Sequence, residues 1–287
     1  MENVIVFVLG LVVGSFINML VYRTAVGYGL LSSRGRRPWR SFKDCFVSLA
    51  MTDKFSFCDF CGKQLRWWEN IPVVSYLIQE GKSRCCGKKL SVLYPIVEIV
   101  TGLLFLQILN SNIEILNNFK IQNLNFQTIL YLVISMAIVG FLVFSAVFDL
   151  KYMILPDFST NSLIFLALVY KLLMGVDANL ILADALWGVS LYGFFYFLHV
   201  LTKGKGMGFG DVKLAFVMGF FLGWPRAIVS LYTAFIVGAV AGIIVIVFFK
   251  KKRKNRLIPF GPFMILGIIV SWWWGDSIWN YFVKALY

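Results

Sequence analysis

Two aspartates stand out because each lies at the end of a strongly apolar run. Asp149 closes one run in F-D-L-K-Y-M-I-L-P-D, residues 148–157, and Asp211 opens another in G-M-G-F-G-D-V-K, residues 206–213. Carboxylates at membrane depth are costly to keep and usually serve a function. Two carboxylates that share a water molecule can hydrolyse an amide, one taking the water's proton and the other, kept protonated, donating to the scissile carbonyl. The pair therefore favours aspartic-protease chemistry, with helix caps or an ion site as the alternatives.

The residues around Asp211 suit the same chemistry. Gly206, Gly208 and Gly210 alternate just before the aspartate, and a missing Cβ allows an extended peptide to approach the carboxylates. We predict that these three glycines, together with Lys213, bind the substrate.

A second group of chemically active residues is formed by four of the five cysteines. They occur as Cys58-x2-Cys61 and as the adjacent pair Cys85 and Cys86. Thiols at such spacing are typical of a structural zinc site with sulfur ligands at about 2.3 Å. A regular zinc ribbon would have a second C-x2-C, whereas Ser83 stands three residues before Cys86. Cys58, Cys61 and Cys86 are predicted ligands, the fourth is Cys85 or Cys45, and unligated cysteines in a small reduced core are the alternative.

The composition predicts what kind of structural elements carry these residues. Of the 287 residues, 60% are hydrophobic and only 14% are charged, which excludes a soluble enzyme and indicates an all-α polytopic membrane protein. A single histidine, His199, excludes an H-E-x-x-H zinc protease, and neither a G-x-S-x-G elbow nor a phosphate-binding loop is present. About eight apolar runs are long enough, with tilt, to cross a bilayer: 3–22, 94–109, 128–149, 158–175, 179–201, 212–223, 227–249 and 258–274.

The charge distribution predicts the orientation of these spans. The net charge is +13, and with residues 23–93 inside, every lysine and arginine faces the cytoplasm except Lys120, Lys171, Arg226 and Lys284. Membrane orientation thus explains the basic charge, and no nucleic-acid partner is expected. Both termini are predicted to face outward, and both aspartates are predicted to lie at the inner face. The run 250–256 is interpreted as an orientation signal that also binds anionic membrane lipid.

Three domains follow from this organisation. Residues 1–22 are predicted to be a retained first transmembrane helix, because Glu2 stands where a signal peptide would be basic. Residues 23–93 form a small cytoplasmic zinc-ribbon-like module between the first two spans, and residues 94–287 form the membrane bundle with the aspartates.

The chain resembles the type IV prepilin peptidases, membrane aspartic proteases also named leader peptidases. The resemblance rests on G-S-F-I-N-M-L-V-Y-R at 14–23, C-D-F-C-G-K-Q-L-R-W-W-E-N-I-P at 58–72, Y-P-I-V-E at 94–98, both aspartate segments, and P-F-G-P-F at 259–263. It implies that Asp149 and Asp211 cut the basic leader from prepilins or pseudopilins at the cytoplasmic face of the inner membrane. It also implies S-adenosylmethionine-dependent N-methylation of the new N-terminus, a step associated with the N-terminal third. S-R-C-C at 83–86 departs from the family's second C-x2-C.

Two rival functions use the same aspartates. A transporter would bind a proton or cation there. An intramembrane protease resembling presenilin shares a G-x-G-D element, but its P-A-L motif is absent and the cysteine module argues against it.

Other marked residues have simpler interpretations. His199 is expected to be a polar anchor at the membrane interface, with a role in the site as the alternative. Glu98 is expected to pair with a lysine or arginine, and its place in Y-P-I-V-E leaves a functional role as the alternative. Asp157 fits a helix cap after Pro156. Asp177 and Asp184 are expected near the outer face, far from the proposed chemistry.

Overall fold

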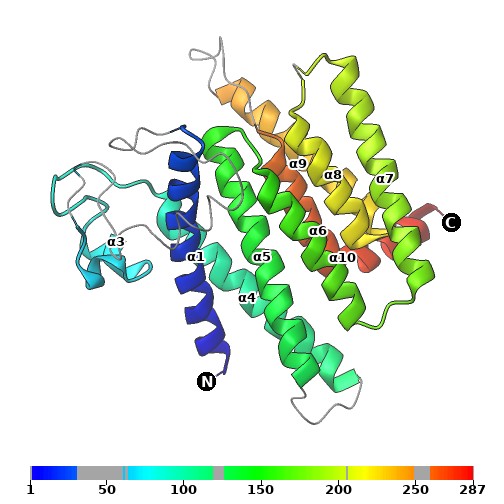
Figure 1. Cartoon of the computed structure of the whole chain (residues 1–287), viewed down its shortest axis with the longest axis horizontal. Helices are drawn as coiled ribbons and strands as arrows, with labels where there is room; N and C mark the ends of the chain where they lie inside the picture. The colour runs from blue at the N-terminus through cyan, green and yellow to red at the C-terminus, as the bar shows by residue number, and fades with distance from the viewer. Residues whose placement is uncertain are drawn as a thin grey trace. The chain divides into compact units, whose positions relative to one another are not determined.

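The computed structural model describes most of the chain. The described residues are 2–30, 61, 64–118, 126–204, 206–248 and 259–286. They divide into an N-terminal unit, Met1–Asn125, and a C-terminal unit, Phe126–Tyr287. Each unit is described by itself (Figure 1).

Two long helices build the N-terminal unit. Helix α1, Glu2–Gly27, packs along α4, Leu93–Asn118. Glycines allow the backbones to approach closely: a Cβ at Gly10 would lie 2.6 Å from Gly102 Cα, and one at Gly14 would lie 2.7 Å from Glu98 Cα. Small residues at such crossings are typical of helix pairs in membranes. The pairing places residues 14–18 of α1 beside the first turns of α4.

Short elements connect these helices. They are the 3-10 helix η1, Trp67–Asn70, and helix α3, Val74–Ile78. An antiparallel bridge joins Lys82 to Lys89 and closes the turn that carries Cys85 and Cys86, and the described residues contain no longer strand. The expected all-α class is therefore confirmed.

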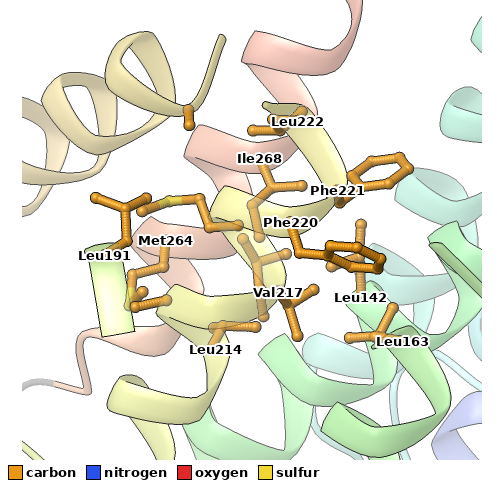
Figure 2. Close-up of a cluster of buried hydrophobic side chains, with 14 of the residues drawn as sticks. Leu142, Leu163, Leu191, Leu214, Val217, Phe220, Phe221, Leu222, Met264 and Ile268 are labelled. Carbon is orange, nitrogen blue, oxygen red and sulfur yellow. The ribbon is translucent and has the colours of Figure 1, made fainter. Parts of the chain in front are cut away.

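In the described part of the C-terminal unit, six helices lie side by side (Figure 1). They are α5 Phe126–Tyr152, α6 Asp157–Leu173, α7 Ala178–Leu201, α8 Phe209–Leu222, α9 Arg226–Phe248 and α10 Gly261–Leu286. Helix α8 is buried on nearly every face, with Leu214, Val217 and Met218 at most 2% exposed. Figure 2 shows the apolar cluster around it, to which α5, α6, α7 and α10 all contribute. The short helix α8 is thus the centre of this unit.

Each of the eight predicted apolar runs coincides with one helix. By length and apolar composition, five of these helices can cross a membrane: α1, α4, α5, α7 and α9. Helices α6 and α8 have 17 and 14 residues, fewer than the roughly 20 that span a bilayer without adjustment. A membrane protein with several spans is therefore established, while the count of eight stays a prediction.

Candidate active site

Asp149 lies in the last two turns of α5 and is 5% exposed. The backbone N–H of Gly261, the first residue of α10, faces its carboxylate. A Cβ at Gly261 would lie only 2.5 Å from Asp149 Oδ2, so the carboxylate lies directly against the α10 backbone. Oδ2 is buried without a hydrogen-bond partner among the described residues. A buried acceptor with spare capacity is unusual in a folded protein and is typical of a reactive group.

Asp211 lies in the first turn of α8 and is 8% exposed. The Gly208 backbone N–H donates to Asp211 Oδ2 at 3.3 Å, which orients the carboxylate at the helix start. The Asp149 carboxylate acts electrostatically on Asp211. The two side chains, 62 positions apart in sequence, therefore lie at one end of the C-terminal unit, where α5 ends and α8 begins.

Leu155 helps to hold the two aspartates in place. A Cβ built on Gly210, the neighbour of Asp211, would lie 2.8 Å from Leu155 Cβ, and one built on Gly261 would lie 3.4 Å from Leu155 Cδ1. The side chain is 7% exposed. Leu155 thus packs against the backbone next to both carboxylates. Sequence reasoning missed Gly261 and Leu155 as site residues, although P-F-G-P-F at 259–263 was a signal for the former.

The glycines before Asp211 have several contacts. Gly206 lies against Thr202, with a built Cβ 3.0 Å from Thr202 Cγ2, and Gly208 orients Asp211 as described. His199 Nδ1 lies 2.8 Å from the Met207 carbonyl oxygen, to which it donates. The predicted anchor His199 therefore holds the glycine segment. Substrate binding by Gly206, Gly208 and Gly210 stays a prediction.

Lys213 makes an ion pair with Asp157, at 2.6 Å between Nζ and Oδ1. The expectation that Asp157 caps α6 is wrong in detail, because Pro156 occupies the cap position. Asp157 is instead the first residue of the helix, where its charge favours the helix dipole. Substrate binding by Lys213 stays a prediction.

Three of the predicted zinc ligands come together. The sulfur atoms of Cys61, Cys85 and Cys86 all lie within 4.8 Å of one another, and Cys61 Sγ is 2.9 Å from Cys85 Sγ. Cys58 and Cys45 lie outside the described residues, as does the basic run 250–256. Two thiolates on one zinc ion stand roughly 3.8 Å apart at tetrahedral geometry with bonds of about 2.3 Å, so small adjustments suffice to fit a metal. Ser83 donates to, or accepts from, Cys85 Sγ at 3.2 Å and lies beside the cluster.

Two acidic residues outside the Asp149 and Asp211 pair have partners in the structure. Asp184 pairs with Lys171 at 2.6 Å. Glu98 accepts the Val73 backbone N–H at 2.7 Å and interacts with the Ser15 side chain, and no lysine or arginine among the described residues forms an ion pair with it.

Comparison with known proteins gives close matches over almost the whole chain. A prepilin leader peptidase/N-methyltransferase of Stutzerimonas stutzeri is 31% identical, and the match covers 94% of this chain and 90% of the relative. Proteins of the same name are 32% identical in Xanthomonas campestris pv. campestris, over 94% of this chain and 90% of the relative, and 31% identical in Neisseria gonorrhoeae, over 95% and 91%. This chain belongs to the prepilin leader peptidase family.

Two family models match separate ranges of the chain. Residues 8–111 match the bacterial peptidase A24 N-terminal domain, and residues 136–243 match the type IV leader peptidase family. The second range contains both aspartates. No solved structure matches the chain. The resemblance inferred from the sequence motifs is confirmed, and the transporter interpretation has no support.

Proposed function

We propose that this chain is an inner-membrane aspartic endopeptidase that removes the basic leader from prepilins or pseudopilins, with Asp149 and Asp211 as its catalytic pair. The observation that carries the proposal is the convergence of two buried carboxylates from α5 and α8 at one end of the C-terminal unit. The names of the relatives supply the substrate class and the reaction.

The residues of the site have defined chemical tasks in this proposal. One carboxylate takes a proton from a water molecule, and the other, protonated, donates to the carbonyl oxygen of the amide that is cut. The Gly208 N–H holds Asp211, and the α10 backbone at Gly261 limits the movement of Asp149. Because the two carboxylates share one proton, they act as a coupled pair.

The site is proposed to face the cytoplasm. Lys151 and Lys213 lie close in sequence to the two aspartates, and basic residues concentrate in cytoplasmic segments. At that face a prepilin presents its basic leader to water and its apolar helix to the bilayer. The amide to be cut would then lie within reach of water.

The test is cleavage of a prepilin by membranes that contain the protein. Asp149→Asn and Asp211→Asn should each abolish leader removal, because a neutral amide cannot take the water's proton. Asp177→Asn is the matched control, since Asp177 is exposed before α7 and should tolerate the change. Retained cleavage in either active-site variant would remove that residue from the pair.

We also propose that the protein methylates the new N-terminus, with S-adenosylmethionine as the methyl donor and residues 23–93 involved in the step. The name that the relatives share supports the reaction. Mass spectrometry of the processed substrate checks it: the wild-type protein should add one methyl group to the α-amine, and only when the donor is present.

Zinc is proposed as a structural metal in the N-terminal unit. Cys61, Cys85 and Cys86 supply three sulfur ligands, and Cys58, three residues before Cys61, is the proposed fourth. Zinc would fix the turn that carries Cys85 and Cys86, because a module of this size lacks a large apolar core.

A further inference from the structure

Glu98 is a buried acid in an apolar helix, outside the proposed catalytic pair. It lies in the second turn of α4 and is 7% exposed. Removing a carboxylate from water is costly unless partners compensate. Within the described ranges, no lysine, arginine or histidine forms an ion pair with Glu98. The partners that the described residues give it are hydrogen-bond donors.

The partners of Glu98 come from two segments. The Val73 backbone N–H donates to Oε2 at 2.7 Å, and the Ser15 side chain of α1 also hydrogen-bonds the carboxylate. Gly14 permits this approach, since a Cβ there would lie 2.7 Å from Glu98 Cα. Glu98 thus joins α1, α4 and the segment before α3.

Val73 has a strained backbone. Its φ is 59° and its ψ is −49°, a conformation that is an outlier for a β-branched residue. Such conformations persist only when surrounding contacts hold them. The carboxylate of Glu98 supplies such a contact at the strained residue itself, because it accepts the Val73 N–H at 2.7 Å.

The position of Val73 is transmitted to the cysteine turn by backbone hydrogen bonds. Helix α3 begins directly after Val73, and Gly81 N–H donates to the Tyr76 carbonyl at 3.0 Å. The Leu90 N–H then donates to the Gly81 carbonyl at 2.7 Å, beside the turn with Cys85 and Cys86. A fixed Val73 therefore orients α3 and the turn that follows it.

We propose that Glu98 is a positioning residue for methyl transfer, which holds the α3 and cysteine segment against the α1/α4 pair through the Val73 amide. This inference rests on the proposed function, in which residues 23–93 take part in methylation. It predicts that loss of Glu98 impairs methylation selectively, because the proposed peptidase carboxylates belong to the C-terminal unit.

The test compares cleavage and methylation of one prepilin by intact mass. Glu98→Ala should lower the methylation rate about tenfold or more, the effect expected when a partly buried donor loses its acceptor, and leave the cleavage rate within about twofold of wild type. The methylation rate of Glu98→Gln, which keeps a neutral acceptor, should lie between those of the wild type and Glu98→Ala. Glu80→Gln is the matched control, because Glu80 is exposed in the same segment.

Two further measurements separate positioning from general packing. Glu98→Ala should speed amide hydrogen exchange of residues 73–78. Adding Val73→Gly to Glu98→Ala should restore part of the methylation, because glycine adopts a positive φ without strain. Unchanged methylation in Glu98→Ala, equal loss of cleavage and methylation, or no recovery in the double variant would overturn the inference. A wild-type protein that cleaves but never methylates would instead contradict the proposed function.

Discussion

The Lys213 ammonium lies 2.6 Å from Asp157 Oδ1, so an ion pair connects the first turn of α6 to the start of α8. Lys213 follows Asp211 by two positions, and its Nζ also lies 5.0 Å from the centre of the Phe209 ring. The pair therefore helps to fix the end of α8 that carries Asp211. Helix positioning through this ion pair and the predicted substrate binding are two separable hypotheses for the same lysine.

Substitution of both partners distinguishes these roles. If Lys213 acts through the ion pair, Lys213→Met and Asp157→Asn should each lower the cleavage rate by about two- to fivefold, as expected for a partly exposed pair. The exchanged variant Lys213→Asp with Asp157→Lys should recover part of the loss. A large rise in KM confined to the Lys213 variant would show that Lys213 contacts substrate instead.

The absence of a side chain at Gly261 is expected to be essential for activity. Gly261→Ala would put a Cβ 2.5 Å from Asp149 Oδ2, so the carboxylate or α10 must move. We expect cleavage to fall at least about tenfold, because misplacement of a reacting group by about 1 Å is enough for such a loss. Initial cleavage rates check this. Gly242→Ala is the control, since no atom lies within 4 Å of a Cβ built there, and it should keep wild-type activity.

The Lys171–Asp184 pair is expected to matter for stability rather than catalysis. The side chains are 8% and 19% exposed, and a Cβ at Gly223 would collide with Asp184. Removing one partner leaves the other charge buried, which costs roughly 3–5 kcal/mol. Asp184→Asn should therefore lower the Tm of detergent-solubilised protein by several degrees. The double variant Lys171→Met with Asp184→Leu should be more stable than Asp184→Asn, and the opposite order would show that the pair is not the source of the effect.

Zinc content tests the cysteine cluster. Purified protein should contain about one zinc ion per chain, and Cys61→Ser or Cys86→Ser should lose it, because a structural site needs its full set of thiolates. Cys85→Ser and Cys45→Ser decide which of these two residues completes the set with Cys58, Cys61 and Cys86: zinc loss in the former with retention in the latter supports the grouping of Cys61, Cys85 and Cys86. Metal-free wild-type protein with all thiols titratable would contradict the site.

Much of the architecture could be predicted from local sequence. Every predicted apolar run coincides with a helix, because a backbone in lipid must satisfy its hydrogen bonds within the segment and apolar composition therefore specifies helices directly. The apolar runs also indicate Asp149 and Asp211 as candidate functional residues, because these are charges at the ends of such runs. The motifs were sufficient to predict the family. The Val73 amide as a partner of Glu98 and the Lys213 partner of Asp157 could not be predicted, since charge type alone does not identify a neighbour.

The membrane class, the helices and the family depend on composition or on short contiguous motifs, and all three can be predicted from the amino-acid sequence. Other contacts became known only from the fold: Gly261 lies against Asp149, Leu155 packs beside both aspartates, and Glu98 accepts the amide of Val73. These contacts join residues from different elements, and the local spacing of apolar residues contains no information about which distant backbone they meet. The physical reason is that hydrophobic burial is non-directional, whereas close packing and hydrogen bonds select individual partners.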